Sequence, residues 1–457
     1  MIKCIDKDAH MHIQAFLDQH GWTKFQWFIF IMMFLVAFFD GMDTAVMGYI
    51  APDLIRDWNI SKTDLIPVLS AALVGAAIGA IVLGPLADRL GRKTLLLFSV
   101  FIFSFSCVLS SFAQNLTQLE ILRFITGLGL GAALPNAVTL LSEYCPSQRR
   151  AFIVNTMYCG FPIGAAAGGF AAAYIIPYFG WQSMLMLCGA LPLLLCIFMA
   201  VFLPESVRYL LLKDASNDRV QKILQKLKPA VQPIQIHLEE KNTPLSAMQS
   251  MRMVFSRKYA VGTLSLWLCF FSGLMIFYGI INWMPVLFKE AGMPPHLGPA
   301  VSGLFALGGI GAMLNGWLMD RFNGNRIIAI CTFLTAICVA LIGTVIDFSL
   351  ALFILLMICA GTLQNTAQSS LPVLAAKFYP TAIRTTGVSW MCGVGRFGAV
   401  AGTMSMGYLV NSSMSWGLIF AVLAIPAVVM TVCMLLKNHY EEKADEGKYS
   451  ASSYSAE

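Results

Sequence analysis

Strongly apolar runs of about 20 residues recur along the whole sequence, each long enough to cross the ~30 Å hydrocarbon core of a membrane as a helix. Hydrophobic residues make up 58% of the 457 residues and charged residues only 12%, which is too little polar surface for a soluble globule of this size. The runs do not alternate as the strands of an outer-membrane barrel do. We therefore predict an all-α polytopic membrane protein and exclude a water-soluble enzyme.

The apolar runs form two sets of six, separated by one long polar stretch. The predicted spans are 27–50, 65–87, 94–113, 118–144, 151–176 and 181–203, then 259–288, 297–319, 327–346, 350–376, 383–410 and 415–436. The predicted organisation is a tail at 1–26, a six-helix half at 27–203, a central loop at 204–258, a second half at 259–436 and a disordered tail at 437–457. An amphipathic patch in the loop, containing Val220, Ile223, Leu224 and Leu227, predicts a short surface helix.

Lysine and arginine indicate how the spans are oriented. Outside the spans, all of them except Arg56, Lys62 and Lys289 fall on the side that carries both chain ends. Because positive residues remain on the cytoplasmic side, both termini are expected to be cytoplasmic. Topology thus accounts for most of the net charge of +6, and we expect no nucleic-acid partner.

The two halves repeat each other. GPLADRLGRK, at 84–93, matches GWLMDRFNGNR, at 316–326, and a second match lies 234 residues apart, with Gly127, Pro146 and Arg150 opposite Gly361, Pro380 and Arg384. Related halves in a membrane protein usually enclose a site near the midplane, which is reached alternately from either side as the halves rock. The duplication therefore predicts a transporter.

Two acidic and two basic residues lie deep inside the apolar spans, away from the span ends, where a charge costs at least about 2.5–3.5 kcal/mol. Asp40 and Asp43 share one face of the first helix. Depth counted along the spans places Asp43 level with Arg123 and Asp40 level with Arg396. We predict an ion pair between Asp43 and Arg123, proton coupling through this group, and a clamp for a substrate carboxylate at Arg396.

Aromatic and amide side chains inside the spans are candidates for the remaining surface of a substrate, and we expect about a third of them to contact it. They are Phe39, Tyr158, Tyr278, Trp283, Trp390, Phe397, Asn136, Asn155, Asn282, Gln364, Asn365 and Gln368. Glu120 and Glu143, at the ends of the fourth span, have no assigned role. All six histidines lie outside the spans, so we expect no catalytic or metal site there and no intramembrane enzyme.

Several motifs resemble those of the major facilitator superfamily. Residues 84–94 resemble its signature between helices two and three, Arg123 with Gly127, Gly129 and Gly131 resembles its fourth-helix motif, and PESVRYL, at 204–210, resembles a sixth-helix ending of its sugar and organic-ion branches. DGMD, at 40–43, and GVGRFG, at 393–398, resemble the aromatic acid:proton symporter branch, and are most similar to its 4-hydroxybenzoate and protocatechuate permeases.

This resemblance implies twelve helices in two pseudo-symmetric halves and import of an aromatic carboxylate across the bacterial inner membrane. The proton gradient would drive import without a cofactor, and we expect a monomer surrounded by lipid. In the superfamily the turn between helices two and three is associated with latching the outward-open state. We carry this latch to Gly84, Asp88, Arg89, Arg92, Asp320 and Arg321.

Other functions stay open. PESVRYL also suits a proton symporter of a non-aromatic acid such as muconate, or of a sugar. A drug exporter is disfavoured because phenylalanine separates Gly160 from Pro162, where exporters usually have adjacent glycine and proline. A membrane sensor without transport is the alternative from another class.

Overall fold

Helices dominate the computed structural model, which describes residues 11–19, 21–83, 86, 90–213, 218–227, 236–237, 247–294, 296–311, 318–319, 321–345, 349–380, 383–412 and 414–454. The long helices of the first half are α2 (Lys24–Trp58), α3 (Lys62–Leu83), α5 (Arg92–Ser110), α6 (Leu116–Glu143), α7 (Arg150–Tyr158) and α8 (Gly160–Phe202). Those of the second are α12 (Ala260–Glu290), α13 (Leu297–Leu307), α15 (Gly324–Val345), α16 (Leu350–Phe378), α17 (Arg384–Asn411) and α18 (Trp416–Tyr454).

Nine helical segments of the described chain are long and apolar enough to cross a membrane. One of them, 152–202, contains two spans, because Gly180 leaves the helical conformation with φ 77° and ψ 168°. Two shorter or less apolar spans complete the set: α13 with the 3-10 turn η2 (Gly308–Gly311), and the 28-residue α17. Within the described residues, each of the twelve expected spans thus contains helix.

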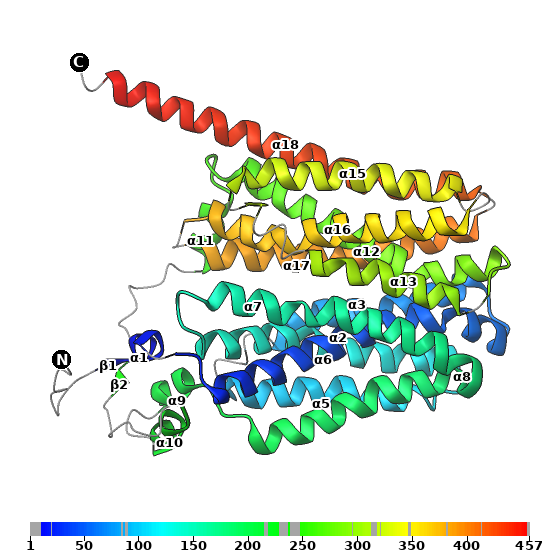
Figure 1. Cartoon of the computed structure of the whole chain (residues 1–457), viewed down its shortest axis with the longest axis horizontal. Helices are drawn as coiled ribbons and strands as arrows, with labels where there is room; N and C mark the ends of the chain where they lie inside the picture. Colours follow the sequence, from blue (N-terminus) through cyan, green and yellow to red (C-terminus); the bar gives the residue numbers. More distant parts are fainter. Residues whose placement is uncertain are drawn as a thin grey trace.

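The helices form two bundles that lie side by side (Figure 1). In the first, α2 packs on α8 and α3 on α6; in the second, α12 packs on α17 and α15 on α18. The packing repeats residue by residue. A Cβ at Gly164 would lie 1.8 Å from the carbonyl oxygen of Phe38, and one at Gly398 would lie 2.1 Å from that of Phe271. Because these two contacts lie 234 and 233 residues apart, the bundles share one architecture.

The two bundles contact each other at one end as well as along the seam between them. We call the end with Lys24 and Tyr454 the terminal end, and the end with Trp58 and Lys62 the distal end (Figure 1). Lys62 forms a salt bridge with Glu290 at the distal end. Closer to the middle of these helices the backbones of α2 and α12 are in direct contact, since a Cβ at Gly48 would lie 2.3 Å from the carbonyl oxygen of Ile281. The helical core is therefore closed at its distal end.

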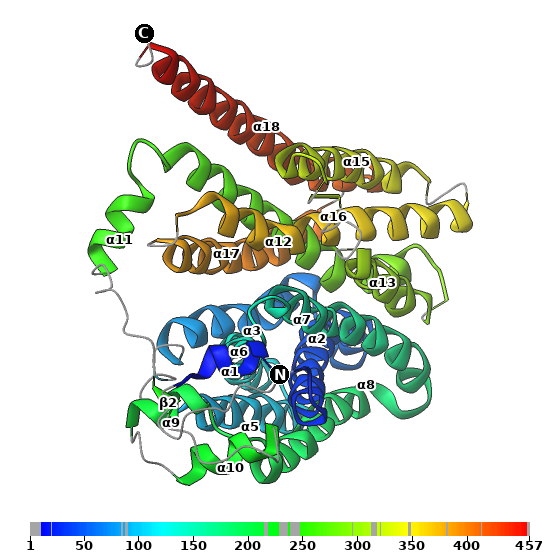
Figure 2. The same cartoon turned by 60° about the vertical axis from the view of Figure 1, so that its left-hand side comes forward.

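Short elements cover the terminal end of the first bundle (Figure 2). They include α1 (Ile13–Gln19), α9 (Val207–Lys213), α10 (Asp218–Leu227) and a two-residue parallel pair of β1 (Met11–His12) and β2 (Ile236–His237). The helix α11 (Ala247–Val254) lies beside the second bundle.

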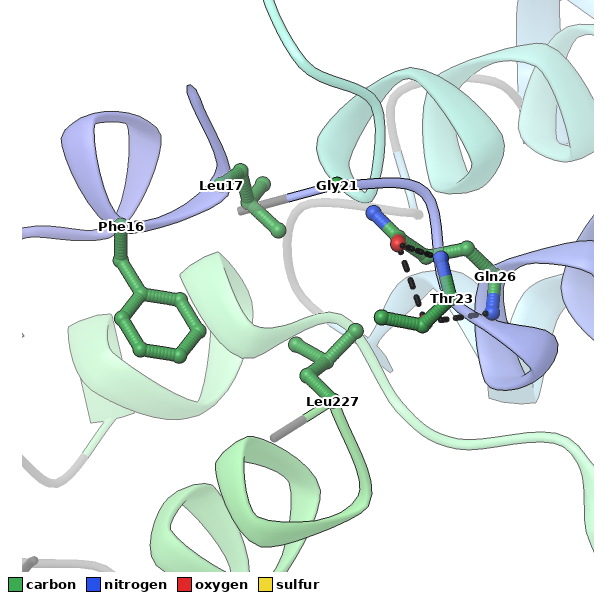
Figure 3. A pocket seen from close by; sticks show the side chains of 6 residues that line it. All are labelled: Phe16, Leu17, Gly21, Thr23, Gln26 and Leu227. Carbon is green, nitrogen blue, oxygen red and sulfur yellow. Dashed lines mark hydrogen bonds between the residues drawn. The ribbon is translucent and has the colours of Figure 1, made fainter. Parts of the chain in front are cut away.

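The helix predicted from the amphipathic patch is α10, and its apolar side chains Val220, Ile223, Leu224 and Leu227 are buried. Leu227 and Phe16 of α1 line a small pocket together with Thr23 and Gln26 (Figure 3). Thr23 and Gln26 form the capping box that begins α2. The central loop and the N-terminal segment are therefore packed together.

The C-terminal tail differs from its prediction as a disordered segment, because α18 continues as helix to Tyr454. Local contacts account for this extension. Lys437 is buried and donates to Glu441 one turn later at 2.7 Å and to Asn325 of α15 at 2.9 Å. Arg326 binds Glu442 at 2.8 Å. The polar composition suggested disorder, whereas these pairs tie the first turns beyond the span to α15.

Candidate substrate and coupling site

Asp43 of α2 and Arg123 of α6 form a fully buried ion pair. Nη1 of Arg123 donates to Oδ1 of Asp43 at 2.9 Å, and Nη2 donates to Oδ2 at 2.8 Å. Nη2 also reaches the main-chain oxygen of Asp43 at 3.3 Å. Two parallel bonds match the planar fork of a guanidinium to both carboxylate oxygens. The ion pair predicted from helix depth is therefore confirmed.

The fold itself does not require this pair. Matching Pro52 to Pro285 and Gly127 to Gly361 places Ile276 opposite Asp43 and Met357 opposite Arg123. Both apolar side chains are fully buried in the second bundle. The same helix packing is thus built once with two charges and once with two aliphatic side chains. Because apolar residues replace a buried ion pair well, stability alone does not explain the charges.

Asp40 lies one helical turn before Asp43 and has a different environment. Its side chain is 6% exposed and accepts a hydrogen bond from Thr44 at 3.3 Å. The charges of Arg396 and Asp43 both act on it. Asp40 therefore has a cationic neighbour across the seam without the bidentate pairing that holds Asp43.

Arg396 of α17 reaches across the seam into the first bundle. It donates from Nη1 to the carbonyl oxygen of Ala76 in α3 at 3.1 Å and from Nη2 to that of Gly131 in α6 at 3.5 Å. Ala76 and Gly131 approach closely because Gly131 has no side chain. Within the described residues, Arg396 forms no salt bridge. Neutral carbonyls position the guanidinium and leave its charge available to an anion.

Two tyrosines complete this group. Tyr158 of α7 and Tyr278 of α12 each lie within electrostatic range of both Asp40 and Arg396. Tyr278 also contacts the side chain of Thr44. Tyr158 is 42% exposed, so its ring is accessible. Four helices from both halves thus place a carboxylate, a guanidinium and two phenols around one position. Thr44 was not among the predicted site residues. Its i, i+4 spacing from Asp40, which puts both side chains on one helix face, was the sequence signal that could have identified it.

Five of the six predicted amides donate hydrogen bonds to protein groups in the described part of the chain. Asn136 donates to Ala132 at 2.7 Å, Asn282 to Thr403 at 2.9 Å and Gln364 to Gly273 at 3.1 Å. The side-chain oxygens of Asn282, Gln364 and Gln368 are buried without a hydrogen-bond partner in the described part of the chain.

The aromatic candidates divide between packing and exposure. Trp283 is fully buried and donates from its indole nitrogen to Thr403 at 2.8 Å, so it holds α12 on α17. Phe39 is buried against Phe38 in an edge-on contact. Trp390 is 49% exposed and stacks on another tryptophan, Trp267, with ring centroids 6.1 Å apart. The positions of these residues in the sequence did not distinguish the buried rings of Trp283 and Phe39 from the exposed ring of Trp390.

Much of the predicted latch lies outside the described residues, namely Gly84, Asp88, Arg89 and Asp320. Arg321 is described and exposed. Arg92 at the start of α5 forms a salt bridge of 2.8 Å with Glu143 at the end of α6. Glu143, which had no assigned role, also accepts a hydrogen bond from Ser206 of the PESVRYL segment. The loop and sixth-helix motifs therefore meet through Glu143.

An all-helical bundle of two related halves, with charged groups buried around their seam, is the architecture of a secondary transporter. The family model described as Major Facilitator Superfamily matches residues 33–403 and 300–453, and the chain belongs to that superfamily. It is a multi-pass membrane transporter and not an enzyme.

Similar proteins cover nearly the whole chain. It is 43% identical to the 4-hydroxybenzoate transporter PcaK of Acinetobacter baylyi, over 94% of this chain and 95% of that protein. It is 39% identical to the gallate transporter of Pseudomonas putida, over 96% of this chain and 97% of that protein. The xylose transporter XylE from E. coli shares the fold, with a TM-score of 0.69 over 90% of this chain and 99% of that one at 17% identity.

Proposed function

We propose that the protein is a proton-coupled symporter that imports aromatic carboxylates such as 4-hydroxybenzoate and protocatechuate by alternating access. The observation that carries this proposal is the identity of about 40% with transporters named for 4-hydroxybenzoate and gallate along almost the whole chain. Both named compounds are small rings with a carboxylate and one or more hydroxyls. The group around Asp40 and Arg396 offers a cation for the carboxylate and hydrogen-bonding phenols for the ring substituents.

In this mechanism Arg396 binds the carboxylate of the substrate. The guanidinium is held by two carbonyl oxygens and is not neutralised by them, so it retains its attraction for an anion. When the substrate engages Arg396, Asp40 loses part of its counter-charge and takes up a proton. Each ligand therefore favours the binding of the other, which is reciprocal coupling.

Asp43 and Arg123 have a supporting role in the coupling. Their bidentate bonds keep the Asp43 carboxylate fixed and paired close to Asp40. A fixed anion at this position adds to the charge that acts on Asp40. Of the two aspartates, Asp40 is thus the better candidate to load and release the proton.

We place the protein in the bacterial inner membrane with both termini in the cytoplasm, because lysine and arginine gather on the side of the chain ends. It would function as a monomer, use the proton gradient without a cofactor and bind no nucleic acid. The distal end is then periplasmic. Closure at that end describes a transporter whose site is withheld from the periplasm.

The test uses purified protein in proteoliposomes with an imposed pH gradient. We expect labelled 4-hydroxybenzoate to accumulate, and unlabelled protocatechuate and gallate to compete better than muconate or xylose. Stronger competition by muconate or xylose would replace the aromatic substrate by a non-aromatic acid or a sugar. A lack of flux for every compound would favour a sensor.

The Asp40→Asn variant tests the coupling step in the same vesicles. It removes the proton site and keeps the size of the side chain, so we expect gradient-driven accumulation to fall at least about tenfold while exchange of substrate across the membrane continues. Asp57→Asn, which makes the same substitution at the solvent-accessible end of α2, is the matched control and should retain driven uptake. Unchanged accumulation by Asp40→Asn would refute the assignment of the proton to this carboxylate.

A further inference from the structure

Three basic residues depart from the charge asymmetry of the chain. Arg56, Lys62 and Lys289 are the lysines and arginines outside the predicted spans that fall at the distal end, away from the chain termini. These residues run against the bias that keeps lysine and arginine on the cytoplasmic side. Their contacts in the folded protein are therefore the place to look for a role. Two of these three residues connect the halves, and the third does not.

Lys62, the first residue of α3, extends from the first bundle to the second. Its ammonium forms a salt bridge with Glu290, the last residue of α12. It also donates to the carbonyl oxygen of Val410 at 3.3 Å. Val410 lies in the last turn of α17, where helical carbonyls lack an internal partner and the helix end carries partial negative charge. Lys62 thus caps a helix of the opposite half.

Lys289 makes the reverse connection. It belongs to α12 of the second bundle, and its ammonium donates to the carbonyl oxygen of Pro52 in α2 at 2.7 Å. Each half therefore contributes one lysine that binds the other half. Arg56 differs, because its salt bridges with Asp53 at 2.8 Å and Asp57 at 2.9 Å stay within α2.

The lysines lie over a closely packed seam. At Gly48 the backbone of α2 touches that of α12. Ile66 of α3 is 2% exposed and lies against Gly407 of α17, beside Trp283. These contacts exist only while the distal ends of the halves are together, so opening of the distal end has to break every lysine contact.

We propose that Lys62 and Lys289 form a reciprocal clamp that holds the distal end closed and sets the balance between the two facing states of the transporter. The proposal rests on the alternating access of the proposed function, and not on which acid is carried. Side-chain exposures of 27% for Lys62 and 36% for Glu290 leave the salt bridge within reach of water. This salt bridge is consequently weak enough to break in every transport cycle.

The test measures how often the distal seam opens. Ile66→Cys is the reporter, and its rate of modification by a maleimide is measured in the purified full chain in detergent, without substrate. Labelling of the same chain without the reporter is subtracted. We expect Lys62→Met and Lys289→Met each to raise the labelling rate, and the double variant to raise it several-fold, because the distal-open state becomes more populated. Arg56→Met is the matched control and should leave the rate unchanged.

Equal labelling in the parent, both single variants and the double variant would overturn the clamp, as would an equal rise in Arg56→Met. Lys62→Glu with Glu290→Lys provides a second measurement if the double variant fails to fold. This exchange should bring the rate below that of Lys62→Glu alone, and failure to do so would also count against the clamp. Labelling needs no substrate, so the two proposals can fail separately. If the parent protein transported no aromatic acid, the proposed function would be refuted, and the labelling rates would still test the clamp.

Discussion

At the scale of single residues, the two aspartates of the first helix have separate environments. Asp43 is paired on both oxygens with Arg123, whereas Asp40 faces the charge of Arg396 across the seam. Their i, i+3 spacing placed both on one helix face, and counting depth along the spans predicted the division by matching Asp43 with Arg123 and Asp40 with Arg396. Helix rotation decides it, because only one of the two carboxylates can reach Arg123 from a rigid helix.

The buried ion pair gives the first prediction. Asp43→Ile or Arg123→Met alone leaves an uncompensated charge, and we expect either to lower stability by about 3–5 kcal/mol. The double variant Asp43→Ile, Arg123→Met copies the apolar pair Ile276 and Met357 of the other half, so it should recover most of the loss. Thermal unfolding in detergent measures this difference. A double variant less stable than both single variants would show that the two halves pack differently around these positions.

At the scale of elements, α1 attaches the N-terminal segment to the loop between α6 and α7. Asp18 accepts hydrogen bonds from the main chain and the hydroxyl of Ser147, each at 2.6 Å. Gln14 donates to Cys145 at 3.2 Å and accepts from Arg150. With Phe16 and Leu17 packed near α10, this helix joins the central loop to the first bundle.

Docking of α1 should depend on pH. The hydrogen bond from the Ser147 hydroxyl lowers the pKa of Asp18 below its ordinary value of 3.8. A carboxyl with a lowered pKa contributes stability that is complete above the ordinary value and is lost as the pH falls through the lowered one. We expect Asp18→Asn at neutral pH to increase amide hydrogen exchange in residues 13–19 severalfold. Gln14→Ala serves for comparison. Protection in Asp18→Asn equal to the parent would mean that the apolar contacts alone hold the helix.

At the scale of the whole molecule, glycines set how closely helices approach, and their position relative to the seam determines the effect of adding a side chain. Gly127 contacts Ala72 inside the first bundle, whereas Gly48 contacts Ile281 in the other bundle. Crowding inside a bundle strains the fold. Crowding between bundles is relieved when they separate.

We therefore expect Gly127→Ala to lower the thermal stability of the protein by about 1–3 kcal/mol, as overpacking usually does. Gly48→Ala should change stability less and should favour the distal-open state, since its Cβ would lie 2.3 Å from a main-chain oxygen across the seam. Unfolding temperatures together with maleimide labelling of Ile66→Cys separate the two effects. A Gly48→Ala variant that is labelled at the parental rate would show that the helices adjust without opening.

The sequence by itself determined the helical spans, the duplication and the presence of charges in the membrane, because hydropathy, helical period and repeated motifs are local properties. It also placed Asp43 level with Arg123, since depth follows from a fixed rise per residue. The packing of the helices was needed to show that Arg396 donates to carbonyls of the other half and that Glu143 pairs with Arg92. It also showed that α18 continues into the tail and that Lys62 and Lys289 bind across the seam. These contacts depend on helix rotation and crossing, which no single segment of the chain specifies.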